Sequence, residues 1–305
     1  MNPRNAERAT SQAILVFIGT AYALSVALSL LIGLTGGHGS ALFALGYLSM
    51  FIPAITVLLV RAAMNEGPRV RWNSFPLRFL PVALLLIPGV LHAVMLPLMG
   101  RVEGGVQWQN WLTREADGLY HAPASRGWGA LTIQGLVAHI VLHAVFGLIA
   151  VSSLAFFEEI GWRAWLLPRL VDRIGARRAV VATSIIWGVW HVPFQLAGIQ
   201  YIEGVSLLRV SITIVPGTVA AGLILGWLWL RTESIWLVAI AHGASNNWGQ
   251  YAFKYMKDSG TPDRDMEVLG AGSVALLLVG VFLLWSIRSR RRSYLGAASA
   301  SVPLS

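Results

Sequence analysis

The sequence predicts an all-α fold, a polytopic membrane protein built as a bundle of about eight transmembrane helices. Of its 305 residues, 56% are hydrophobic and only 12% are charged, whereas a soluble domain has about 25% charged residues. The apolar residues gather in runs close to the ~20 residues that a helix needs to cross a bilayer. Cysteine is absent, which excludes disulfides, thiolate metal sites and cysteine nucleophiles.

Polar connections divide the apolar residues into the predicted spans. The first span, residues 13–34, would be about 33 Å long as a helix, and its apolar run exceeds the core of a signal peptide, so we expect a retained span. Residues 163–178 are amphipathic and arginine-rich and are predicted to lie at the membrane surface. The longest polar connection is 100–129. The other predicted spans are 41–60, 79–99, 130–158, 179–196, 207–230, 235–255 and 269–287.

The net charge of +9 arises from basic residues placed between the apolar runs rather than along one face. Such charge orients membrane helices, so no nucleic-acid partner is expected. Arginines are concentrated in the connections on the side of the N-terminus, which predicts that both termini are cytoplasmic. The excess of arginine over lysine is typical of a GC-rich bacterial genome. We therefore expect a multi-pass protein of a bacterial plasma membrane.

Two adjacent carboxylates, Glu158 and Glu159, end the fourth predicted span. Each charge near mid-bilayer costs about 2.5–3.5 kcal/mol on insertion scales, which favours a functional interpretation. Glu159 and Arg163 have the i, i+4 order of a helical ion pair. Glu158 lies about 100° round the helix and is free to face another neighbour. Alternatively, both glutamates only mark the helix end and pair with nearby arginines.

Two later spans carry polar residues as well. His191 is predicted about 18 Å inside the membrane, two residues before Pro193, which removes a backbone donor. His242 and Asn246 are four residues apart and share a helix face. Taken singly, His191 could be a buried histidine bonded to a carbonyl, and the other pair could join two helices by hydrogen bonds. Together with Glu158, they place polar groups on three spans at depths that can meet.

A second histidine pair, His139 and His143, also has the i, i+4 spacing of metal ligands. His143 precedes Glu158 by fifteen residues, or about 22 Å along a helix. We therefore expect this pair to pack or to lie at the opposite interface.

These motifs resemble the CPBP family, which includes the type II CAAX prenyl endopeptidases and the bacterial bacteriocin-immunity (Abi) proteins. The matching residues are Glu158, Glu159 and Arg163, then Trp187 and His191, then His242 and Asn246. The resemblance covers residues 154–247, about a third of the chain. The family pattern usually has phenylalanine where this chain has Trp187. The family's eight-helix architecture agrees with the predicted span count.

The resemblance implies an intramembrane endopeptidase that hydrolyses a peptide bond of a membrane-associated protein or peptide. Glu158 and His191 would hold a water molecule and remove its proton. His242 and Asn246 would donate hydrogen bonds to the tetrahedral oxyanion. The alternative is a non-catalytic membrane scaffold or bacteriocin-immunity protein that retains the fold. A channel or transporter is disfavoured because the polar groups cluster on one side of the membrane.

Glu159, paired with Arg163, would fix the helix end and orient Glu158. Whether the site uses a metal ion is left undecided, because Glu158, His191 and His242 could bind zinc and leave its fourth coordination position free. The lack of an HExxH motif slightly favours a mechanism without a cofactor.

The chain is accordingly divided into three regions. Residues 1–129 form an N-terminal three-span region with a polar outer loop, and residues 130–255 a CPBP/Abi-like catalytic core. Residues 256–305 supply the last helix and a basic cytoplasmic tail. The expected partners are membrane lipids and a peptide or protein substrate reached from the cytoplasmic half of the bilayer.

Overall fold

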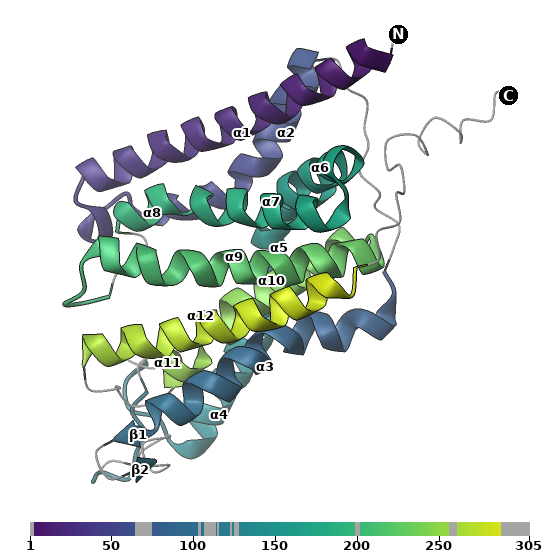
Figure 1. Cartoon of the computed structure of the whole chain (residues 1–305). Helices are drawn as coiled ribbons and strands as arrows, with labels where there is room; N and C mark the ends of the chain where they lie inside the picture. The colour runs from purple at the N-terminus through teal and green to yellow at the C-terminus, as the bar shows by residue number, and fades with distance from the viewer. Residues whose placement is uncertain are drawn as a thin grey trace, which may run out of the picture.

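Long helices run side by side through the whole protein and form a single bundle (Figure 1). The computed structural model describes residues 3–64, 75–102, 105–106, 114, 116–122, 124, 128–198, 202–255 and 261–287. Within these residues, 7 helical stretches are long and apolar enough to cross a membrane. The prediction of an all-α polytopic membrane protein is therefore confirmed.

The N-terminal part supplies three of these stretches and a small hairpin. Phe43–Phe51 is a 3-10 helix that continues into α2, and Leu77–Phe79 is a 3-10 turn that opens α3. The hairpin is antiparallel and lies at the end of the bundle where α3 finishes (Figure 1). The elements are α1 (Pro3–Leu34), η1 (Gly37–Gly39), η2 (Phe43–Phe51), α2 (Ile52–Met64), η3 (Leu77–Phe79), α3 (Leu80–Met99), β1 (Arg101–Val102) and β2 (Gly105–Val106).

The second half contains the helices that carry the predicted motifs. Helix α12 packs along α9, which in turn packs along α7. Helix α9 approaches α7 closely at Gly222 and Gly226, since a Cβ on either would lie 2.9 Å from Ser184 or Val180 of α7. The elements are α4 (Ile133–Leu142), η6 (His143–Gly147), α5 (Leu148–Glu159), η7 (Ile160–Leu166), α6 (Leu167–Ile174), α7 (Ala176–Trp190), α8 (Val192–Leu196), α9 (Leu207–Thr232), α10 (Ile235–Trp248), α11 (Tyr251–Tyr255) and α12 (Pro262–Trp285).

The fourth span is longer than predicted, because α4 to α6 form one helical run, Ile133–Ile174, interrupted by the π-helices η6 and η7. The prediction that residues 163–178 lie at the membrane surface is wrong for the first half of that stretch. Arg163 and Arg169 are buried together with Trp162 and Trp165. Arg169 donates a hydrogen bond to the Trp165 carbonyl oxygen at 3.0 Å and lies over the Trp165 ring. These interactions satisfy the guanidinium inside the bundle.

The predicted span 235–255 is not one continuous helix. Helix α10 ends at Trp248, Gly249 turns the chain, and the short α11 follows. At 14 residues, α10 is about 21 Å long, which is less than the ~30 Å hydrocarbon core. It packs against α5, α3 and α9, so other helices rather than lipid cover most of its surface. Because its neighbours enclose it, α10 can be shorter than the hydrocarbon core is thick.

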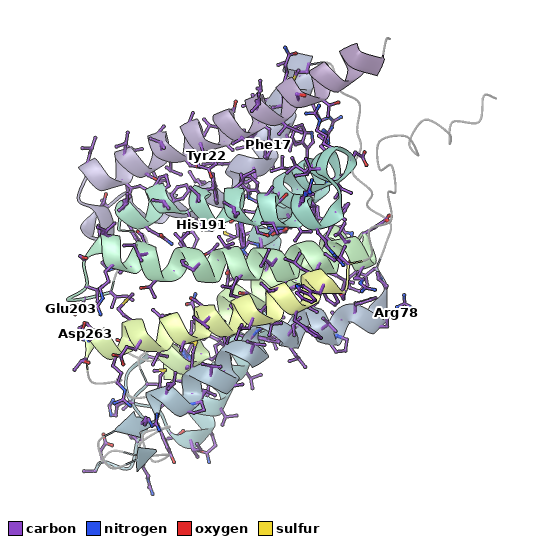
Figure 2. All side chains as sticks on the ribbon, in the orientation of Figure 1. Phe17, Tyr22, Arg78, His191, Glu203 and Asp263 are labelled. Atoms are coloured by element: carbon purple, nitrogen blue, oxygen red, sulfur yellow. The ribbon has the colours of Figure 1, made fainter. Side chains whose placement is uncertain are left out.

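The polar ends of the bundle agree with a membrane-spanning orientation. Figure 2 shows Arg78 at one end, Glu203 and Asp263 at the other, and His191 between the two ends. Helix α1 begins, and α12 ends, at the same end of the bundle (Figure 1). That arrangement fits the prediction that both termini share one side, while the cytoplasmic assignment stays a prediction. The basic cluster at 288–292 lies outside the described residues, and the division at residues 129 and 255 also stays a prediction.

Candidate active site

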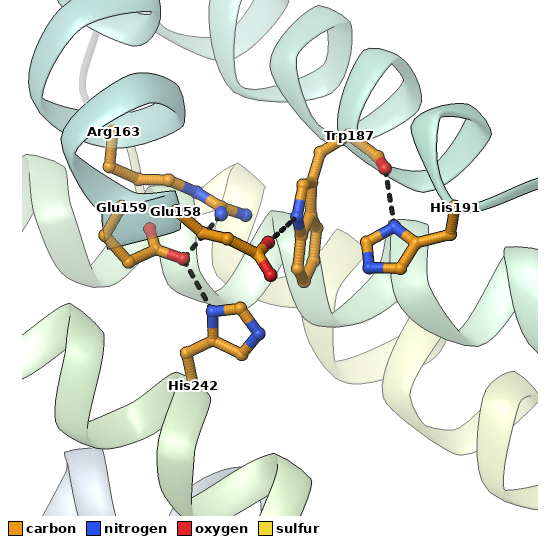
Figure 3. Close-up of polar contacts among 6 residues, drawn as sticks. All are labelled: Glu158, Glu159, Arg163, Trp187, His191 and His242. Atoms are coloured by element: carbon orange, nitrogen blue, oxygen red, sulfur yellow. Dashed lines mark hydrogen bonds and ion pairs between the residues drawn. The ribbon is translucent and has the colours of Figure 1, made fainter. Parts of the chain in front are cut away.

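Three helical elements bring the candidate residues together in the interior of the bundle (Figure 3). Glu158 and Glu159 end α5, His242 lies on α10, and His191 caps α7. Glu158 and His242 are 3% and 2% exposed, and Glu159 and Arg163 are fully buried. Burial of this kind is costly for charged groups unless they are paired, so their partners decide what each can do.

Glu159 is the acceptor of two hydrogen bonds at one oxygen. Arg163 Nη1 and His242 Nδ1 each donate to Glu159 Oε1 at 2.8 Å. The predicted Glu159–Arg163 ion pair is therefore present, and it extends across to α10. The Arg163 guanidinium also lies over the Trp187 ring, with Cζ 4.3 Å from the ring centroid. Glu159 is thus committed to structure, because it joins η7 to α10 with charge-assisted bonds.

Glu158 has a different and less complete set of partners. Its Oε2 accepts a hydrogen bond from the indole Nε1 of Trp187 at 2.9 Å. No other hydrogen bond to this carboxylate is formed by the residues that the structure describes. Glu158 therefore retains an oxygen, Oε1, that can accept a proton from a bound water.

His191 reaches the site through Trp187 rather than through Glu158. Its Nδ1 is 2.8 Å from the Trp187 carbonyl oxygen, and the two rings meet edge to face with centroids 5.1 Å apart. The indole stands between the Glu158 carboxylate and the His191 imidazole in Figure 3. Among the described residues, no hydrogen bond joins Glu158 directly to His191.

The hydrogen bonds of the two histidines determine their tautomers. A carbonyl and a carboxylate are acceptors, so Nδ1 of His191 and Nδ1 of His242 each carry a proton. In the neutral ring, Nε2 then holds the lone pair. Both histidines are thereby set to accept a hydrogen bond or a proton at Nε2. The predicted role of His242 as an oxyanion donor would require its imidazolium form.

The remaining predicted residue, Asn246, lies one turn beyond His242 and is half-buried. It makes no hydrogen bond within the described part of the chain. Its neighbour Asn247, which the sequence analysis did not single out, is buried and donates to the His143 carbonyl oxygen at 2.9 Å. Trp248 donates in the same way to the Ala144 carbonyl oxygen. These side chains occupy carbonyls of the π-helix η6, a feature without a sequence signal.

The second histidine pair belongs to an aromatic cluster away from the site. The rings of His139 and His143 are 4.3 Å apart, and His139 also meets Trp128 and Tyr255 edge to face. This agrees with the prediction, made from the fifteen-residue separation of His143 from Glu158, that the pair packs away from Glu158.

The zinc set considered from the sequence does not fit this arrangement. Among the described residues, no three histidine or acidic side chains form a group that could hold a metal ion. The Nε2 lone pairs of His191 and His242 are chemically suitable as zinc ligands. However, the indole of Trp187 stands between Glu158 and His191, and Glu158 is already bonded to it (Figure 3).

Fold and site together define a polytopic helical membrane protein with a buried Glu–Arg–Trp–His cluster. Residues 138–248 match the family model of the Rce1-like type II CAAX prenyl endopeptidases. The chain is also similar to CAAX prenyl protease 2 of Methanococcus maripaludis, 26% identical over 128 residues. That alignment covers 40% of this chain and 46% of the relative, so the match spans about half of the relative's length. These findings confirm the resemblance to the CPBP/CAAX protease family, and the matched segment contains every predicted site residue.

Proposed function

We propose that this protein is an intramembrane endopeptidase that hydrolyses a peptide bond of a membrane-associated protein or peptide with a water activated by Glu158. The observation that carries the proposal is the inequality of the two adjacent glutamates. Each carboxylate is bonded at one oxygen, but Glu159 accepts from an arginine and a histidine at Oε1, whereas Glu158 accepts from a neutral indole at Oε2. A buried carboxylate that is not tied to a cation and has one oxygen available suits a general base.

The proposed reaction uses the side chains in separate roles. Glu158 Oε1 takes a proton from water, whose oxygen attacks the scissile carbonyl carbon. A histidine Nε2 accepts a hydrogen bond from the second O–H of the water. This bond orients the oxygen lone pair that attacks the carbonyl carbon. His191 is the partner that the motifs predict, while His242 lies on the same side of the indole as the Glu158 carboxylate in Figure 3. Asn246, whose amide forms no hydrogen bond with the residues that the structure describes, donates to the oxyanion.

Collapse of the tetrahedral intermediate breaks the C–N bond. The proton held by Glu158 passes to the leaving amine, which restores the carboxylate. No step requires a cofactor, and we propose a glutamate-dependent rather than a metal-dependent enzyme.

The proposed substrate carries an apolar anchor. A pocket of about 540 Å³ lies between α3, α5 and α10, with Phe156, Phe157 and Trp236 in its wall. Phe157 directly precedes Glu158, so a lipid chain in this pocket would be near the general base. The name of the relative, CAAX prenyl protease 2, supports a prenylated peptide as the first substrate to test. We propose access from the cytoplasmic half of the bilayer, with both termini in the cytoplasm of a bacterial cell.

A peptide-cleavage assay tests the proposal. Purified protein in proteoliposomes is given a fluorogenic farnesylated CAAX peptide and the same peptide without the farnesyl group. We expect cleavage of the farnesylated peptide, a fall of at least 10²-fold for Glu158→Ala and His191→Ala, and no change for Glu203→Ala, which is an exposed carboxylate at the end of the bundle. Equal activity of Glu158→Ala, His191→Ala and wild type would show that the protein does not cleave by this mechanism and would favour the scaffold alternative.

A further inference from the structure

Trp187 contacts four of the other five residues drawn in Figure 3, although the sequence offers it only as an aromatic position in a motif. Its indole Nε1 donates to Glu158, and its carbonyl oxygen accepts from His191. Its ring faces the Arg163 guanidinium at 4.3 Å and meets the His242 ring edge to face at 5.2 Å. Through Arg163 and His242, the ring also packs beside the donors to Glu159.

We propose that Trp187 is the positioning residue for the general base, and that its indole N–H fixes which oxygen of Glu158 receives the proton. This inference rests on the proposed function. A Trp indole is only a donor, so its bond to Oε2 leaves Oε1 as the acceptor for water. The terminal torsion of a glutamate is broad, and without a donor the buried carboxylate could turn toward the Arg163 guanidinium.

The surrounding packing keeps the indole in this position. Trp187 is 3% exposed, and its ring is bounded by Arg163 on one face and by the edges of two imidazoles. The next residue, Gly188, has no room for a side chain, because a Cβ there would lie 2.4 Å from Val219 Cγ2 of α9. The backbone of α7 is therefore pressed against α9 beside Trp187, and rotation of the indole would break its hydrogen bond without finding space.

The indole N–H, and not the ring alone, is what this role requires. Phenylalanine would keep a ring against Arg163 and the two histidines but could not donate to Glu158. We therefore expect the orientation of Glu158 to depend on this hydrogen bond.

Two replacements of Trp187 test the inference with the farnesylated peptide. Trp187→Phe removes the donor and part of the ring, and 3-benzothienylalanine at position 187 replaces the N–H by sulfur with nearly the same shape. Loss of a hydrogen bond to a charged group predicts a fall in kcat of about 10- to 100-fold for both, with KM unchanged. The analogue keeps the test decisive should the phenylalanine variant not fold.

Trp248→Phe is the matched control. It removes an indole hydrogen bond of 3.0 Å to the Ala144 carbonyl oxygen, away from Glu158, and we expect its kcat to equal that of the wild type. The inference is overturned if the analogue at position 187 retains wild-type kcat, or if Trp248→Phe loses as much as Trp187→Phe. A Glu158→Gln variant separates the two proposals: its full activity, or an inactive wild type, overturns the proposed function and the positioning role with it. Loss of activity in Glu158→Gln combined with a fully active analogue overturns only the role of Trp187.

Discussion

Removal of the Arg163 guanidinium by Arg163→Met should destabilise the protein strongly. The substitution keeps a long apolar side chain but deletes the cation that donates to Glu159 Oε1 at 2.8 Å. Glu159 is completely buried. Among the described residues, its carboxylate would keep only His242 as a hydrogen-bonding partner. A bundle that holds this unneutralised charge must be less stable than one that holds the pair.

The magnitude follows from the burial of both partners. Breaking a buried ion pair by removing one member costs about 3–5 kcal/mol, because the other charge is left in a low-dielectric interior. The cation–π contact of Arg163 with Trp187 is lost as well and adds up to about 2 kcal/mol when desolvated. The remaining hydrogen bond from His242 to Glu159 offsets part of the loss. We therefore expect the free energy of unfolding to fall by about 3–5 kcal/mol.

The assay is reversible unfolding in mixed micelles, followed by circular dichroism. The control is Arg209→Met, which removes one partner of the exposed Arg209–Asp263 ion pair and should cost no more than about 1 kcal/mol. The double variant Glu159→Gln, Arg163→Met exchanges the charged pair for a neutral one and should be more stable than Arg163→Met alone. If Arg163→Met costs no more than Arg209→Met, the ion pair is not what permits Glu159 to be buried.

Three further outcomes are expected. Gly243→Ala places a Cβ 2.1 Å from Ser152 Oγ and 2.6 Å from its Cα. The resulting separation of α10 from α5 should cost about 1–3 kcal/mol and lower the cleavage rate. Gly19→Ala is the control, because among the described residues no atom beyond its own stretch of helix lies within 4 Å of a Cβ there, and equal behaviour of the two variants would contradict the packing argument. Asn247→Leu leaves the His143 carbonyl without its donor and should lower the free energy of unfolding by about 1–3 kcal/mol. An unchanged free energy of unfolding would show that this hydrogen bond does not contribute to stability. Cleavage in a verified zinc-free sample should equal that of untreated enzyme, and activity lost on chelation but restored by zinc would refute the metal-free mechanism.

The helical class and the ion pair could be predicted from the sequence, because both depend on local pattern. Apolar runs of span length report helices directly, and an i, i+4 spacing places Glu159 and Arg163 on one face. The predicted surface location is wrong for the first half of residues 163–178, because the charge of Arg163 and Arg169 was given more weight than their aromatic neighbours. Buried arginines are explained only once their partners in the bundle are known.

Other features depend on tertiary contacts that no local pattern contains. The π-helices that bracket α5 have the composition of an α-helix, and the end of α10 at Trp248 depends on its enclosure by α5, α3 and α9. The link from Trp187 to Glu158 joins residues that are 29 apart in the sequence. The motif identified Trp187 as an aromatic residue, but the direction of its N–H is set by how α7 packs against α9 and η7.

The site assigns the two glutamates different tasks through their partners rather than through their positions in the sequence. A carboxylate that accepts two charge-assisted hydrogen bonds is held in one orientation by them. Glu159 has that environment, and its bonds fix the α5–η7 junction and the tautomer of His242. Glu158 has a single neutral donor, the Trp187 indole. The structural carboxylate therefore holds the charge that organises the site, and its neighbour is left to exchange a proton with water.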